Sequence, residues 1–77
     1  MPTIKIIDSV KIDLYSREHL PPHFHAIYAG MEVLITIKDY KIYAGKIPNP
    51  QFNKVIEWAK ANQEMLLENF KRLNPRL

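Results

Sequence analysis

The spacing of apolar residues changes once along this chain, and that change is the strongest constraint on its fold. Up to about residue 44, apolar and polar residues alternate, as in residues 10–14, VKIDL. A period of two is typical of strands with one buried face. From Pro50 onward, apolar residues recur every three or four positions, as they do on one side of a helix. The sequence therefore predicts a sheet followed by a helix.

Turn residues divide the first half into short strands. Asp8-Ser9, Gly30 and Lys38-Asp39 are typical of tight turns, and Pro21-Pro22 indicates a longer loop. The expected strands cover about residues 4–6, 10–15, 23–29, 31–37 and 40–44. Because such short connections favour antiparallel neighbours in chain order, the sequence predicts a five-stranded antiparallel meander.

The second half predicts one long helix from about residue 50 to residue 73. Asn49 is a favourable N-cap, Pro50 suits the first helical position, and Asn74-Pro75 ends the helix. One stripe carries its apolar residues: Phe52, Val55, Ile56, Ala59, Leu66, Phe70 and Leu73. The predicted fold is one α+β domain over residues 1–77. Its sheet and His/Pro-Pro loop occupy residues 1–48, and its helix, within residues 49–74, covers one face of the sheet.

Composition narrows the classes of function. The 77 residues include no cysteine, which excludes a disulfide, a thiolate metal ligand and a cysteine nucleophile. The net charge is +3, and the basic residues are spread over both halves instead of forming the patch typical of nucleic-acid binders. No apolar run is long enough to span a membrane. The first residues show no signal-peptide pattern, so a cytoplasmic protein is expected.

All three histidines lie between residues 19 and 25, around Pro21-Pro22. A Pro-Pro step is stiff and extended, so it holds the side chains on either side in a defined relation. His23 and His25 are two apart on one predicted strand and therefore share a face. Phe24 has the apolar parity, so we expect both imidazoles on the face opposite the helix.

That outer face is predicted to be uncovered and of mixed character. Its members by parity are Lys5, Lys11, Asp13, Tyr15, His23, His25, Ile27, Glu32, Leu34, Thr36, Lys41 and Tyr43. An uncovered sheet face in so small a domain predicts a homo-oligomer or a small partner protein. Candidate partner-binding residues are Tyr15, Lys41 and Tyr43 on this face and Trp58 on a flank of the helix. The favoured interpretation of Trp58 is that it completes the core.

The histidines support three interpretations, which the sequence leaves open. In the first, His19, His23 and His25 bind a divalent metal such as zinc, with Glu18 or Asp13 completing or orienting the site.

In the second, the same histidines are catalytic and perform acid–base chemistry on RNA. Glu18 is a weaker catalytic candidate, and Arg17, Lys11 and Lys41 offset the phosphate charge. In the third, the histidines are structural, with His23 and His25 stacking on Tyr15 and Tyr43. Whether the protein is an enzyme stays open at this level.

Several segments together resemble one known family. They are residues 1–4 (MPTI), residues 18–26 (EHLPPHFHA), residues 45–48 (GKIP), residues 55–59 (VIEWA) and residues 66–70 (LLENF). The chain is similar to the bacterial domain-of-unknown-function family 4160, whose members carry a His-x-Pro-Pro-His-x-His motif.

The resemblance implies a component of a toxin–antitoxin-like module with an antitoxin-like partner. It brings no established catalytic residue. The residues themselves make the His/Pro-Pro loop the expected site, for an RNA-directed or metal-binding activity. The alternative is a non-catalytic module that binds protein or nucleic acid through the open sheet face.

Overall fold

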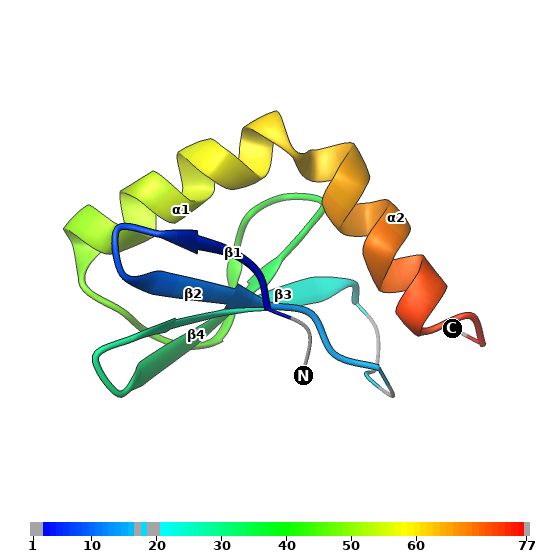
Figure 1. Cartoon of the computed structure of the whole chain (residues 1–77), viewed down its shortest axis with the longest axis horizontal. Helices are drawn as coiled ribbons and strands as arrows, with labels where there is room; N and C mark the ends of the chain where they lie inside the picture. Colours follow the sequence, from blue (N-terminus) through cyan, green and yellow to red (C-terminus); the bar gives the residue numbers. More distant parts are fainter. Residues whose placement is uncertain (1–2, 17, 19–20, 77) are drawn as a thin grey trace.

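The computed structural model describes residues 3–16, 18 and 21–76 and shows five strands followed by two helices (Figure 1). The strands are β1 (Thr3–Ile7), β2 (Val10–Asp13), β3 (His23–Tyr28), β4 (Met31–Thr36) and β5 (Ile42–Gly45). They form one antiparallel sheet in the order β1-β2-β3-β4-β5. The α+β class and the five-stranded meander are confirmed.

Left-handed backbone conformations make the tight turns. Asp8 and Ser9 have φ angles of 46° and 68°, and Ala29 and Gly30 have φ angles of 48° and 80°. Two successive positive φ angles give a turn whose twist matches that of the strands it joins. The last strand begins at Ile42, later than predicted, because the wider connection after β4 covers residues 37–41.

The prediction of one long helix is wrong, because the chain forms α1 (Asn49–Ala61) and α2 (Gln63–Leu73) with Asn62 between them. The side-chain amide of Asn62 donates to the carbonyl of Trp58 at 2.8 Å, and its backbone N–H donates to Ala59 instead, at 3.1 Å. The side chain thus takes the carbonyl that the N–H of Asn62 would use in a continuous helix. The helix axis bends at that point.

Gln63 fixes the bend over the sheet. Its side-chain amide donates to the carbonyls of Ile37 and Lys38, at 3.0 and 3.1 Å. As a result, α1 lies along the sheet, whereas α2 bends down past the end of the sheet where β3 begins (Figure 1). At the start of α1, Pro48 takes the N-cap position expected for Asn49, which is the first helical residue. Within the described residues, neither helix is long and apolar enough to cross a membrane.

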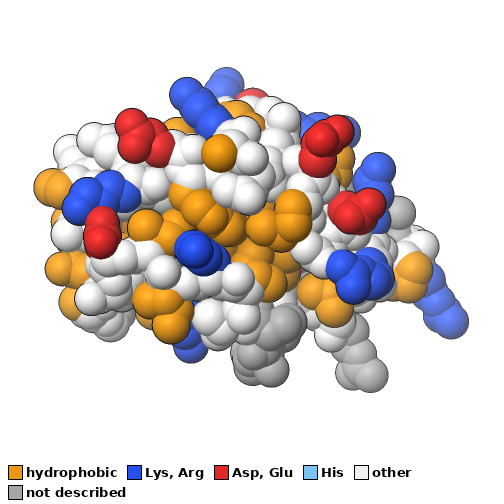
Figure 2. Space-filling view, turned by 45° about the horizontal axis from the view of Figure 1, so that its top comes forward, with side chains coloured by type: hydrophobic (Ala, Val, Ile, Leu, Met, Phe, Trp, Pro, Cys, Tyr) orange, Lys and Arg blue, Asp and Glu red, His pale blue; other side chains and the backbone are white. Residues whose placement is uncertain are grey.

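The core lies between the sheet and the two helices. It consists of Val10, Ile12, Leu14, Phe24, Ala26, Val33, Ile35, Ile37, Ile47, Val55, Ala59, Leu66 and Phe70. Partly buried apolar residues, among them Ile4 and Trp58, pack around it. Figure 2 shows hydrophobic side chains gathered in the middle of one face of the molecule, with charged side chains around them. The interpretation of Trp58 as part of the core is confirmed.

The facing of β1 differs from the prediction. The two-residue turn sets Ile7 opposite Val10 and Ile6 opposite Lys11. Ile7 therefore takes the core side, and Ile6 points outward with 65% of its surface exposed. Lys5, predicted for the outer face, has the parity of Ile7 instead. The turn decides this register, because a shift of one residue exchanges the two faces of a strand.

Among the described residues, the large apolar side chains that are exposed lie on the two edge strands: Ile6 on β1, and Ile42 and Tyr43 on β5. Edge strands with apolar side chains are suited to pairing with another chain. The homo-oligomer or small partner protein stays a prediction.

Candidate functional site

Glu18 and the two described histidines form a compact cluster. Glu18 Oε2 lies 3.0 Å from His23 Nε2, and Glu18 Oε1 lies 3.2 Å from His25 Nε2. Each residue offers a ligand atom, and these atoms lie within 4.8 Å of one another. The His23 side chain is fully buried, whereas 12% of the His25 side chain and 19% of the Glu18 side chain are exposed. The cluster is therefore mostly desolvated but open to water on one side.

The second nitrogen of each imidazole also faces an oxygen. His23 Nδ1 lies 2.8 Å from the carbonyl oxygen of Pro21, and His25 Nδ1 lies 2.8 Å from Glu32 Oε2. A carbonyl oxygen only accepts hydrogen bonds, so His23 carries a hydrogen on Nδ1. The stiff Pro-Pro step holds that carbonyl in place. These contacts at Nδ1 fix the orientation of both imidazole rings.

The two histidines share a face, as their spacing predicts, but their surroundings differ. Phe24, between them, lies in the core on the helix side of the sheet. His25 contacts residues of the sheet and its loop, among them Glu18 and Glu32. The His23 ring, in contrast, lies 5.9 Å from the ring of Phe70 on α2. The predicted separation from the helix holds for His25 and is wrong for His23, because α2 bends round the end of the sheet.

Asp13 supports the cluster through Tyr15. Asp13 is 1% exposed and accepts hydrogen bonds from Thr3 Oγ1 at 2.9 Å and from the Tyr15 hydroxyl at 3.2 Å. The Tyr15 ring meets the His25 ring edge-on at 4.4 Å. Of the two carboxylates predicted to complete the site, Glu18 contacts the imidazoles and Asp13 positions Tyr15.

The contribution of Tyr15 to the stability of the fold is lost at alkaline pH. Burial first, and then the hydrogen bond to Asp13 and nearby carboxylates, raise the pKa of the Tyr15 phenol. Because the folded pKa lies above the unfolded one, this contribution to stability is complete below about pH 10 and is lost as the phenol ionises in the folded state. We expect Tyr15→Phe to cost about 1 kcal/mol at pH 7 through the lost hydrogen bond. Urea unfolding should show this difference shrinking as the pH rises above about 10, and a difference that stays constant there would contradict the assignment.

Comparison with protein families identifies the chain. The family model described as a domain of unknown function, DUF4160, matches residues 10–71. The chain belongs to this family. No curated protein and no solved structure matches it. The match to the DUF4160 model includes Glu18, His23 and His25 and most of both helices.

The other predicted site residues of this DUF4160 chain are not part of the cluster of Glu18, His23 and His25. Arg17 and His19 lie outside the described residues. Tyr43 packs against the His23 ring at 5.4 Å, on the side of β5. The backbone N–H of Lys41 donates to Thr36, which is the residue opposite His23 on β4. Trp58 lies on α1, against the core, and its predicted role in partner binding stays a prediction.

The sequence predicts no role in the DUF4160 site for two polar residues, Glu32 and Asn74. Strand parity predicts Glu32 on the outer face, and the tight turn at residues 29–30 sets it opposite Ile27, diagonal to His25. The two-residue turn is the signal in the sequence that predicts this register of β3 and β4. Asn74 had been assigned only to the end of the helix, and its contacts reach residues 56 and 59 positions earlier. No local signal predicts contacts of that separation.

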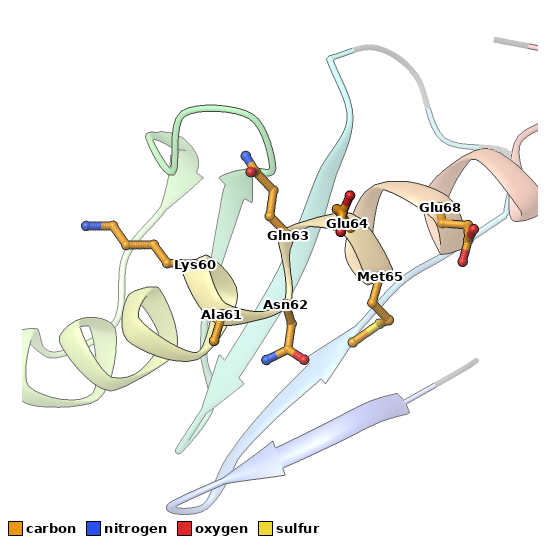
Figure 3. Close-up of a pocket in the computed structure, with 7 residues that line it drawn as sticks. All are labelled: Lys60, Ala61, Asn62, Gln63, Glu64, Met65 and Glu68. Atoms are coloured by element: carbon orange, nitrogen blue, oxygen red, sulfur yellow. The ribbon is translucent and has the colours of Figure 1, made fainter.

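A shallow hollow lies in the helix layer, where α1 meets α2 (Figure 3). Its lining residues are Lys60, Ala61, Asn62, Gln63, Glu64, Met65 and Glu68. Figure 3 shows Asn62 and Met65 pointing to one side of the helices and Lys60 and Gln63 to the other. The polar groups diverge instead of meeting at one point, so the hollow is a consequence of the bend. The histidine cluster is the candidate functional site.

Proposed function

We propose that this protein binds a divalent metal ion, zinc first among them, through Glu18, His23 and His25. The arrangement of the ring nitrogens carries this proposal. Both Nε2 atoms face one carboxylate, while both Nδ1 atoms already face another oxygen. Imidazole nitrogens and a carboxylate are common ligands of zinc in proteins.

A count of hydrogens favours a cation in this cluster. Between the described residues, His23 and His25 make four nitrogen–oxygen contacts that each need one hydrogen, and two neutral imidazoles supply two. When these sit on Nδ1, they bond to the Pro21 carbonyl and the Glu32 carboxylate. Both Nε2 lone pairs then face the negative Glu18 carboxylate. Either two added protons or one divalent cation supplies the missing positive charge, and the cation does so with one ion.

The contacts of the two Nδ1 atoms match those of metal-binding histidines. Such histidines usually donate their other N–H to a carbonyl or a carboxylate, which fixes the ring and strengthens the ligand. Pro21 and Glu32 provide these two acceptors. Two histidines and one carboxylate leave a coordination position for water, as in catalytic zinc sites and some iron(II) sites. A bound metal would act there as a Lewis acid that activates water.

The charges around the cluster favour this proposal over acid–base chemistry on RNA. Glu18 and Glu32 contact His25, and Asp13 lies opposite it on β2. Lys11 pairs with Asp13 at 3.7 Å, so three carboxylates stand against one ammonium group in this set, a balance that repels a phosphate and attracts a cation. A role in a toxin–antitoxin-like module, and a binding role for the open sheet face, stay predictions from the sequence and its resemblance.

Zinc titration against a chromophoric chelator tests the proposal. We expect one zinc ion per chain and an affinity that falls as the pH is lowered, because protons compete for the imidazole lone pairs. His25→Ala should weaken binding by about 100-fold or more, and Glu32→Gln, which removes an orienting carboxylate, by about tenfold.

Glu57→Gln is the matched control for the change at Glu32, because Glu57 is exposed on α1, in the layer on the other side of the sheet. It should leave zinc affinity unchanged. The proposal is wrong if the wild type binds neither zinc nor iron(II), or if His25→Ala binds as tightly as the wild type.

A further inference from the structure

We infer that metal binding at this site is coupled to the docking of the C-terminal end of α2, and that Asn74 is the positioning residue that links the two. The inference rests on the proposed metal site. Glu18 is separated from Asn74 by 56 residues in sequence, yet the two meet in the fold. A well-defined position of Glu18 therefore depends on a docked helix end at Asn74, and the reverse also holds.

Asn74 joins the loop that carries Glu18 to the end of the helix. Its side-chain oxygen accepts a hydrogen bond from the backbone N–H of Glu18 at 2.7 Å. Its side-chain amide donates to the carbonyls of Tyr15 and Phe70, both at 3.0 Å. Asn74 is only 6% exposed, so these bonds are shielded from water. One side chain thus holds the backbone of Tyr15 and that of Glu18 against the end of α2.

A second contact connects α2 to His23, another of the proposed metal-binding residues. The Phe70 ring is 1% exposed and packs 5.9 Å from the ring of His23. The last turn of α2 therefore contacts Glu18 through Asn74 and His23 through Phe70. A metal ion that fixes Glu18 and His23 stabilises the surfaces on which this turn rests. By thermodynamic linkage, the docked helix end strengthens metal binding by the same factor.

The amide of Asn74 is suited to this role because it both donates and accepts. An aspartate can accept from Glu18 but cannot donate to the two carbonyls, and alanine does neither. Asn69 offers a matched comparison on the same helix. Its side chain donates to Met65 at 2.9 Å, four residues earlier, just as Asn74 donates to Phe70. Asn69 has the same residue type and the same local bond, and its side-chain partners among the described residues, Met65 and Arg72, both belong to α2.

The first test compares zinc affinity in Asn74→Ala and Asn69→Ala. We expect Asn74→Ala to weaken zinc binding by about tenfold, the usual loss for a residue that orients a ligand, and Asn69→Ala by less than about twofold. Equal affinities in the wild type and Asn74→Ala would overturn the inference and leave the metal site standing. Absence of zinc binding by the wild type would overturn both.

A double-mutant cycle separates positioning of Glu18 from a general loss of structure. In a Glu18→Ala background, adding Asn74→Ala should change zinc affinity by less than about twofold, because the ligand that Asn74 positions is already absent. A further tenfold loss in that background would show that Asn74 acts on the fold as a whole, and would overturn its assignment as a positioning residue.

Hydrogen exchange on the wild type tests the coupling without any variant. Zinc should slow the exchange of the backbone amides of residues 70–74 several-fold, and leave those of the middle of α1, residues 53–58, unchanged. His25→Ala, which lacks a ligand, should show no such protection at the same zinc concentration. Zinc binding by the wild type without protection of residues 70–74 would overturn the coupling, even if Asn74→Ala failed to fold.

Discussion

Replacement of Gly45 by alanine is expected to lower the free energy of unfolding by about 3 kcal/mol or more, a large part of what a small domain has. Gly45 ends β5 with a φ angle of +76°, a conformation that residues with a Cβ rarely adopt. A Cβ there would lie 2.2 Å from the carbonyl oxygen of Glu32. That oxygen also accepts a hydrogen bond from the backbone N–H of Lys46 at 3.0 Å, so the neighbouring backbone cannot move aside cheaply.

Gly30→Ala is the matched control, because Gly30 has a similar φ angle of +80° and no atom near its position for a Cβ. It should cost only the conformational strain, about 1–2 kcal/mol. Urea unfolding followed by the fluorescence of Trp58, the only tryptophan, measures both. Equal losses in the two variants would mean that the close approach of β5 to Glu32 is wrong.

Replacement of Phe70 by alanine is expected to cost about 3–5 kcal/mol, the usual loss for a buried aromatic side chain. Phe70 belongs to the core and also covers the ring of His23. The same change would expose His23 to water and release the last turn of α2. We therefore expect folded Phe70→Ala, obtained at low temperature or with a stabilising osmolyte, to bind zinc more weakly than the wild type.

Phe70→Leu separates apolar volume from the aromatic ring. It keeps much of the buried volume and should cost less than about 2 kcal/mol. Thermal unfolding of the two variants, with and without zinc, measures these effects. An alanine variant as stable as the wild type would contradict the position of α2 over the end of the sheet.

The sequence by itself determined the local structure of this protein. Alternation of apolar residues set the strands, and turn residues such as Asp8-Ser9 and Gly30 set where they reverse. Short connections then made the sheet a meander, because strands joined by two residues can only pair antiparallel. The parity of β3 likewise put His23 and His25 on one face. These features depend on residues within a few positions of one another.

The tertiary structure decided how the helical segment lies. The apolar stripe from Phe52 to Leu73 misses one turn, because Asn62 and Gln63 stand where it would place apolar residues, but the same spacing continues on either side and predicts one helix. The bend at Asn62 arises because one side-chain amide takes a backbone carbonyl, and because Gln63 finds two acceptors on the far end of β4. Asparagine within a helix only weakly predicts a break, since its side chain can instead point to water.

The tertiary structure also decided the composition of the candidate site. The sequence located the histidine cluster and named Glu18 beside it, but the contact of both Nε2 atoms with one carboxylate depends on the position of Glu18. Asn74, near the other end of the chain, holds Glu18 there through its backbone N–H. Local periodicity carries no information about such a contact, because it reports only on residues within a few positions of one another, whereas Asn74 and Glu18 are 56 positions apart.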